Sequence, residues 1–252
     1  MKASGFLSAG VLFLAVAIPS ILAQSQEEVR HAPDGGTKLM IFSISIPPLA
    51  NAPFTAVVRT EWSRQLDDGT ATVIKNHRTV ARDSRGRIFQ ERRYLTPDGD
   101  QRQTGISQLE FSDPTSREQY ICKPGEHVCE LRNYSASTTM VFNSAGVSNS
   151  GAHEPKSEDL GHQFIEGLDT LGTRETTTLP QDWADDNQPL TVTKEFWFSS
   201  RLGVNLVVKR NDPRSGVQNF RVTDISLSEP DPALFDLPSD FKVIDTRKSA
   251  AQ

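Results

Sequence analysis

The sequence predicts a mainly β protein built on one large, curved antiparallel sheet of about 10 or 11 strands, similar to half of a barrel, with few short helices. Apolar and β-branched residues alternate with polar ones over many short runs, and Gly, Pro or Asp punctuates those runs. Helical spacing of apolar residues is nearly absent. Open sheets this wide tend to curl or to split, so a β-sandwich is the alternative.

The first residues have the order of a secretory signal. Lys2 precedes an apolar run over residues 6–17, and small residues follow up to Ala23. The run is too short and too interrupted for a retained transmembrane anchor. We therefore expect residues 1–23 to be removed, with a cut after Ser25 as the alternative, and the protein to be exported to the periplasm or secreted.

A single domain is expected after the signal. Residues 24–37 are polar and rich in Gly and Pro, which predicts a disordered leader, and residues 246–252 form a disordered tail. The domain spans residues 38–245. It opens with an apolar stretch, residues 39–49, that is too short to cross a membrane. We expect this stretch to pack against the core, and docking on a surface or membrane is the alternative.

Strands are predicted wherever period-two patterning lies between turn signals. The first, from Phe54, places Phe54, Ala56, Val58 and Trp62 on one face, which is typical of a half-buried strand. The predicted strands are residues 54–66, 70–82, 87–95, 105–111, 118–123, 128–134, 161–168, 172–179, 190–199, 203–210 and 216–227. Residues 143–151 are predicted to be a long loop between two β-rich halves.

Two strands are apolar on both of their faces, at residues 196–198 and 206–208. Such strands need cover on both sides, from a second layer, a short helix, or an apolar ligand in the concave sheet. Period two does not tell which face is concave. The candidate ligand-binding residues are Phe54, Trp62, Phe196, Phe198, Leu206 and Val208.

The two cysteines, Cys122 and Cys129, predict one disulfide in an exported chain. If they are directly opposed in a hairpin, residues 124–127 form a four-residue loop, which is a common hairpin length. Opposed residues at a non-hydrogen-bonded position lie within bridging distance. Two buried free thiols are the alternative.

Charge and motifs argue against several classes of protein. The chain has 27 basic and 32 acidic residues, a net charge of −5, so nucleic acid is not an expected partner. Seven arginines (78, 82, 85, 87, 92, 93 and 102) form a stripe that a solvated strand face and edge protection explain, and an anionic partner is the alternative. Acidic pairs such as Asp67–Asp68, Asp98/Asp100 and Asp185–Asp186 are predicted turn residues.

No catalytic constellation is found. The string GVSNSG at residues 146–151 lacks the spacing of a serine nucleophile elbow, and His153-Glu154 is followed by Pro155 rather than by a zinc-binding pattern. The five histidines are scattered. We therefore expect no enzymatic activity, no metal and no cofactor.

Several strings resemble those of exported bacterial proteins of unknown function, of a type abundant in acidobacteria. They are APFTA at residues 52–56, IEG at 165–167, GTRETTTLP at 172–180, EFWFS at 195–199, NDPRSG at 211–216 and FDLPSDFKV at 235–243. The ending at residues 231–238, DPALFDLP, is also similar to the last strand of the class that includes the periplasmic lipoprotein carrier and its sorting-protein relatives. This second resemblance implies a strongly curved antiparallel half-barrel around an apolar cavity.

Two functional hypotheses follow. The first is an exported protein that binds an apolar or lipid-like ligand in a concave β-sheet, with no stable transmembrane anchor after signal cleavage. The second is a cell-envelope interaction or structural module that binds a protein or a polysaccharide, with its partner unknown. Co-purified lipid would separate the two.

Overall fold

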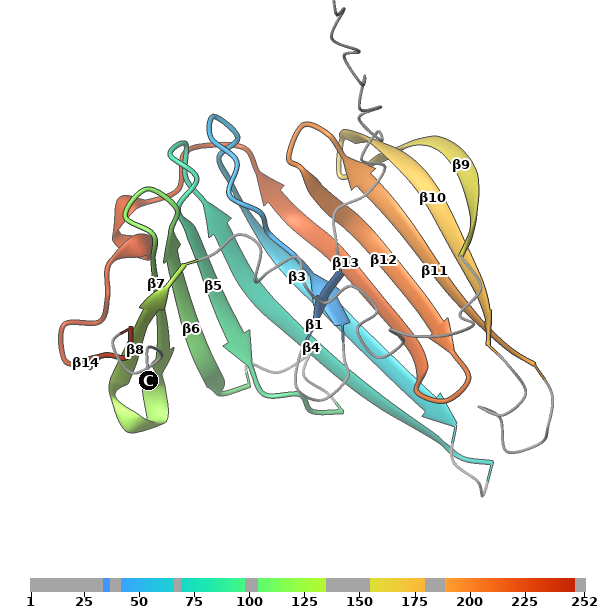
Figure 1. The fold of residues 1–252 in the computed structure, drawn as a ribbon, viewed down its shortest axis with the longest axis horizontal. Helices are drawn as coiled ribbons and strands as arrows, with labels where there is room; N and C mark the ends of the chain where they lie inside the picture. Colours follow the sequence, from blue (N-terminus) through green and yellow to red (C-terminus); the bar gives the residue numbers. More distant parts are fainter. Residues whose placement is uncertain are drawn as a thin grey trace, which may run out of the picture.

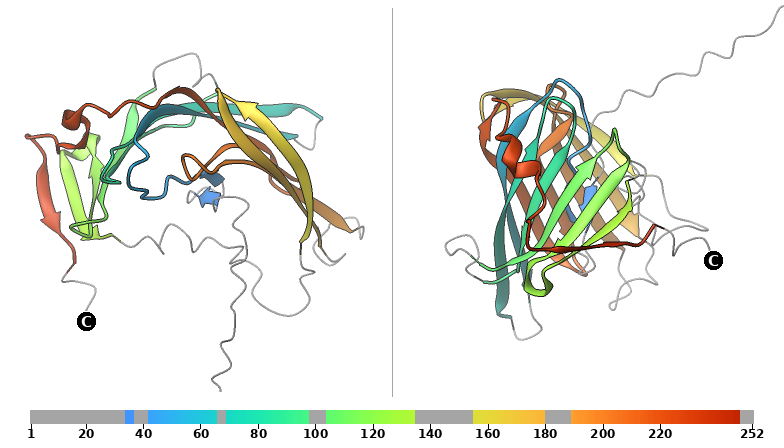
Figure 2. Two further views of the ribbon diagram at one scale, coloured as in Figure 1. Left: turned by 90° about the horizontal axis from the view of Figure 1, so that it is seen from above. Right: turned by 90° about the vertical axis from the view of Figure 1, so that its left-hand side faces the viewer.

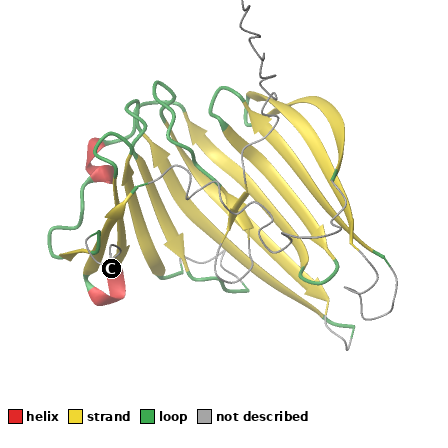
Figure 3. Ribbon diagram, viewed as in Figure 1, coloured by secondary structure: helices red, strands yellow, loops and turns green. Residues whose placement is uncertain are grey.

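The computed structural model describes residues 34–36, 42–65, 69–97, 104–134, 155–179 and 189–247. Within these residues the chain forms a 12-stranded sheet and a separate two-stranded sheet (Figures 1 and 3). The predicted fold class is confirmed: the protein is mainly β, and one wide, curved sheet replaces the alternative sandwich.

Two antiparallel meanders make up the large sheet. The first contains β3 (Phe54–Gln65), β4 (Ala71–Arg82), β5 (Ile88–Arg93), β6 (Ile106–Asp113), β7 (Glu118–Lys123) and β8 (Val128–Asn133). The second contains β9 (Lys156–Ile165), β10 (Leu168–Leu179), β11 (Leu190–Ser199), β12 (Val204–Asp212) and β13 (Gly216–Ser226). β13 pairs with β3 and so joins the meanders, while β14 (Lys242–Asp245) adds to β8 as a parallel strand. The ends of this sheet are therefore β14 and β9.

The sheet bends into an arc, which Figure 2 shows in its left view. The small sheet of β1 (Asp34–Gly36) and β2 (Phe42–Ile44) lies inside the arc. The 3-10 helix η3 (Pro232–Phe235) and the chain leading to β14 lie on the outer side. The two faces of one sheet are thus covered by segments from opposite ends of the domain.

Alternation along β3 fixes which side is concave. Phe54, Ala56 and Val58 are buried, and they belong to the same apolar cluster as Ile44 of β2. Because side chains of a strand alternate between faces, the even-numbered residues of β3 point into the arc. The half-buried strand predicted from Phe54 is confirmed, and its register with the neighbours extends the concave face across the sheet.

One predicted turn is wrong. Strands were expected at residues 161–168 and 172–179, but the hairpin turns at Glu166–Gly167, and β10 continues from Leu168 to Leu179. Both turn residues have a positive φ, 51° and 75°, which suits a two-residue hairpin turn. The expectation of strand rather than helix in this region is confirmed.

Two predictions of disorder also need correction. Residues 34–36 were placed in a disordered leader, but their backbone pairs with residues 42–44. Thr246 and Arg247 were placed in a disordered tail, but Thr246 donates to the Leu131 carbonyl at 2.8 Å and Arg247 donates to Glu118 at 2.9 Å. These two residues extend the attachment of β14 to the sheet.

Several sequence predictions lie outside the described residues. They are the signal at residues 1–23, most of the leader, the loop at residues 143–151, the pairs Asp67–Asp68, Asp98/Asp100 and Asp185–Asp186, the residues His153, Glu154 and Arg102, and the string at 146–151.

The disulfide lies where the hairpin pattern placed it. Cys122 of β7 pairs with Cys129 of β8, their Cα atoms are 3.9 Å apart, and their sulfur atoms are bonded. The connection is the short 3-10 helix η1 (Pro124–Glu126) followed by His127 in the left-handed region. The bond lies on the outer face, within a second apolar cluster that includes Phe89 and Phe111.

Candidate functional site

The concave face contains most of the larger of the two buried apolar clusters. We call its buried residues the concave floor: Phe54, Ala56, Val58, Val80, Ile88, Phe196, Leu206, Val208, Phe220 and Val222. They come from β3, β4, β5, β11, β12 and β13, six strands that the two meanders bring side by side. Only the junction of the two meanders assembles this surface, because neither half of the chain contains all of it.

Residues 42–52, here called the cover segment, lie over the floor. Ile44 and Ile46 are 2% and 3% exposed and pack into the floor cluster. Residues 45–49 form no regular secondary structure, and Pro47 and Pro48 have no N–H group. The carbonyl groups of this segment therefore need donors from elsewhere.

Arg82 supplies several of these donors. Its guanidinium donates to the carbonyl oxygens of Pro47 at 2.8 Å, of Ala52 at 3.0 and 2.9 Å, and of Leu202 at 2.7 Å. It lies over the Phe54 ring at 5.0 Å and is fully buried. Burial lowers the pKa of Arg82 to about 10. One side chain thus ties together the cover segment, β4 and the turn between β11 and β12.

Arg78 lies on the same face of β4, four residues before Arg82. It links the cover segment to a polar cluster. It donates to the Ile44 carbonyl at 2.6 Å and to the Gln90 amide oxygen. Burial, followed by the nearby charge of Arg92, lowers the pKa of Arg78 to about 9, although Glu110 opposes this. The guanidinium therefore lies at the boundary between the apolar and polar parts of the concave face.

The polar cluster consists of Arg78, Gln90, Arg92, Gln108 and Glu110. Glu110, 8% exposed, accepts from Gln90 at 3.1 Å, from Gln108 at 2.6 Å, and from two nitrogens of Arg92. The strand pairing places these side chains on the concave face of β4, β5 and β6. The cluster has two guanidinium groups and one carboxylate.

The arginine stripe is therefore not a solvated face, as the sequence suggested. Arg78 and Arg82 are 5% and 0% exposed, and the side chain of Arg93 is 7% exposed. For Arg78 and Arg82 the physical reason is the cover segment, whose backbone needs donors on the concave side of β4. Arg93 instead pairs with Glu91 and donates to the Thr104 carbonyl. Arg85, at 67% side-chain exposure, fits the original interpretation.

The six predicted ligand-binding residues gather in one region of the sheet. Phe54, Phe196, Leu206 and Val208 belong to the concave floor, and Trp62 packs against it while donating to the Ser215 carbonyl at 2.5 Å. Phe198 is half-buried near the end of β11. The cover segment buries the floor residues, so contact with a ligand stays a prediction. Its apolar stretch packs against the core, as expected for residues 42–49.

The outer side of β11 is covered locally. The ring of Trp197 lies over Gly172, where a Cβ atom would be 2.7 Å from the ring. The indole nitrogen donates to Glu195 at 2.9 Å, and Glu195 also pairs with Arg174 and Lys209. The outward apolar residue of the 196–198 run thus lies against the neighbouring strand β10, while the cover segment lies on the concave side.

A cavity of about 120 Å³ lies at the ends of β5, β6 and β7. Its lining residues include Arg87, Phe111, Tyr120 and Phe235. Ligand pockets for drug-sized molecules are typically about 300–1,000 Å³, so this cavity is too small for a lipid chain.

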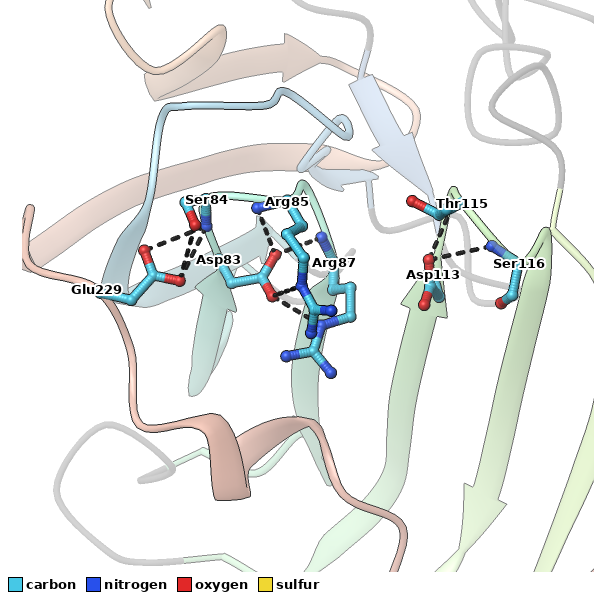
Figure 4. Close-up of polar contacts among 8 residues, drawn as sticks. All are labelled: Asp83, Ser84, Arg85, Arg87, Asp113, Thr115, Ser116 and Glu229. Atoms are coloured by element: carbon cyan, nitrogen blue, oxygen red, sulfur yellow. Dashed lines mark hydrogen bonds and ion pairs between the residues drawn. The ribbon is translucent and has the colours of Figure 1, made fainter.

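The turn after β4, beside this cavity, contacts the C-terminal chain that leads through η3 to β14 (Figure 4). The Asp83 carboxylate accepts from the Arg85 and Arg87 backbones and from the Arg87 side chain at 2.7 Å. Burial alone would raise the pKa of Asp83, but these hydrogen bonds outweigh it and leave the pKa below its ordinary value. Ser84 donates to Glu229, and Arg87 lies 4.6 Å from the Phe235 ring, so both contacts fasten the C-terminal chain.

Other kinds of site find no support in the described residues. They contain no group of three or more His, Cys, Asp or Glu side chains arranged to hold a metal ion. Among them there is also no helix long and apolar enough to span a membrane.

Comparison with known proteins gives distant structural likeness and no sequence match. No protein-family model matches the chain, and no curated protein matches it. MucB in the Pseudomonas aeruginosa MucA/MucB complex aligns at 11% identity and a TM-score of 0.35, over 76% of this chain and 58% of MucB. This chain thus spans less than two thirds of that protein's length.

Two smaller proteins align over most of their own length. A LolA superfamily protein from Nitrosomonas europaea matches at 10% identity and a TM-score of 0.32, over 75% of this chain and 92% of that one. The lipoprotein LppX from Mycobacterium tuberculosis matches at 13% identity and a TM-score of 0.26, over 72% and 89%. The resemblances to the lipoprotein-carrier class and to acidobacterial proteins both stay predictions.

Proposed function

We propose that this protein binds an apolar or amphipathic chain molecule on its concave floor, in the place that the cover segment occupies. The observation that carries the proposal is the nature of that occupant. Residues 44–49 form an apolar, linear segment that starts at the last residue of β2 and continues without regular secondary structure, and its Ile44 and Ile46 pack into the floor cluster. A surface that accepts one linear apolar chain suits another of similar width.

The attachment of the cover segment supports exchange rather than permanent closure. Its packing into the floor depends chiefly on Ile44 and Ile46, and its polar attachment depends on two arginines that donate to main-chain carbonyls. A ligand that competes with the cover binds with an apparent affinity reduced by the fraction of molecules in which the floor is covered. Weakening the cover therefore strengthens ligand binding.

The test is Ile46→Ala, assayed with an uncharged, environment-sensitive naphthylamine dye. Truncation of a buried isoleucine costs about 2–5 kcal/mol of packing. If about 2 kcal/mol of this acts on the cover, the apparent affinity for the dye rises by up to roughly 30-fold. Leu131→Ala is the control, because Leu131 is 6% exposed and faces outward beside Tyr120, away from the cover.

Two results would contradict the proposal. One is saturable dye binding that Ile46→Ala leaves unchanged or that Leu131→Ala raises equally. The other is the absence of dye binding to the native protein together with the absence of solvent-extractable lipid. In that second case the interaction-module hypothesis takes precedence.

A further inference from the structure

We propose that the ligand of the concave floor is an anionic amphiphile, whose carboxylate or phosphate headgroup binds at the polar cluster while its apolar chain lies on the floor. This inference rests on the proposed function and names the chemical class of its ligand. It depends on the charge of the cluster, on its exposure, and on its position next to the floor.

The cluster has an excess of positive charge. Arg78 and Arg92 face one carboxylate, Glu110, and the two guanidinium groups are close enough to repel each other. Along β7 and β8, Lys123 and Arg132 on the same face share Glu130. The concave face of β4 to β8 is thus cationic, although the whole chain has a net charge of −5. An anion bound here would relieve the repulsion between like charges.

The cluster is also reachable and rich in donors. The Arg92 side chain is 29% exposed, and it uses Nε and Nη2 for Glu110. Gln90 and Gln108 are half-buried beside it on the same face. Arginine in such a setting suits carboxylate and phosphate groups because its planar donors match their oxygens.

Arg78 connects the headgroup position to the chain position. Its Nη2 donates to the Ile44 carbonyl of the cover segment, while its Nη1 donates to Gln90 of the cluster. A ligand that displaces the cover removes the Ile44 carbonyl from Arg78. A headgroup oxygen then takes that position as the new acceptor, so one event exchanges both the apolar and the polar contacts.

The experiment compares oleate with oleyl alcohol as competitors of the uncharged dye, below their aggregation concentrations, at pH 8 and low salt. Both molecules have the same chain, so their difference reports the headgroup. Oleate is expected to displace the dye at concentrations about tenfold lower, the equivalent of about 1.4 kcal/mol. Arg92→Gln should abolish this preference and leave displacement by oleyl alcohol unchanged. Arg174→Gln is the control, because Arg174 pairs with Glu158 and Glu195 on the outer face.

The outcomes separate the two proposals. Equal competition by acid and alcohol in the native protein overturns the headgroup inference and leaves apolar binding intact. Loss of preference in Arg174→Gln as well overturns the assignment to the polar cluster. Competition by inorganic phosphate as strong as that by oleate indicates a site for free anions and overturns the amphiphile. No dye binding and no competition at all overturn the proposed function itself.

Discussion

Arg82→Met removes the guanidinium that attaches the cover segment to the sheet and replaces it with a shorter, unbranched apolar side chain. Three carbonyl oxygens, those of Pro47, Ala52 and Leu202, then lose a charged donor at 2.7–3.0 Å. Each hydrogen bond to a charged group contributes about 1.5–3 kcal/mol, so the gross loss over three carbonyls is about 4.5–9 kcal/mol.

The net loss is smaller because the native charge is itself costly. Arg82 is fully buried, and its described hydrogen bonds go to carbonyl oxygens rather than to a carboxylate. Desolvation of such an ion costs several kcal/mol, which methionine avoids. We therefore expect Arg82→Met to lower the free energy of unfolding by about 2–5 kcal/mol. Arg82→Lys should recover little, because an ammonium group does not reproduce the planar fork that reaches three carbonyls.

Urea unfolding followed by tryptophan fluorescence measures the loss, and limited proteolysis locates it. Cleavage within residues 42–52 should appear in Arg82→Met at urea concentrations where the sheet is still folded. Arg59→Met is the matched control, since Arg59 is 48% exposed on the outer face of β3. An unfolding free energy of Arg82→Met within about 0.5 kcal/mol of the native value would refute the reasoning, since that is the usual effect of a surface substitution.

Two further predictions concern the disulfide on the outer face of the sheet and the turn that contains Asp83. Reduction of the Cys122–Cys129 bond should lower stability by only about 2–3 kcal/mol, because the closed loop is short; complete unfolding on reduction, monitored by circular dichroism, would contradict this. Asp83→Asn should destabilise the protein above about pH 4, the unfolded-state value. Because the pKa of Asp83 is lowered in the folded state, its contribution is lost as the pH falls through that lower value. Urea unfolding between about pH 3 and 7 should show the two proteins converging in acid, and a gap that widens there would exclude this role.

Local patterns predicted the sheet well, and the disulfide shows why. Pairing within a hairpin follows from the position of its turn, so Cys122 opposite Cys129 needed no information from the rest of the chain. The same arithmetic around residues 66–70 places Arg82 opposite Phe54, on the buried face of β3. That signal was present in the sequence and would have shown that Arg82 is not solvated.

The contacts of the cover segment could not be predicted from local sequence patterns. Which carbonyls need donors depends on where residues 42–52 lie on a surface made from six strands, and that surface exists only after β13 pairs with β3. The missed turn has a similar origin. Gly161, Gly167 and Gly172 look alike in sequence, but the first lies at a strand irregularity, the second forms the turn, and the third makes room for Trp197.

The two ends of the twelve-stranded sheet also bear on how the protein behaves at high concentration. A sheet end presents backbone groups to which another chain can add, and fibrous aggregates grow in this way. β14 is only four residues long, and β9 has Lys156, Glu158 and Asp159 exposed along it. A short strand at one end and a charged strand at the other discourage copies of the molecule from joining into a continuous ribbon.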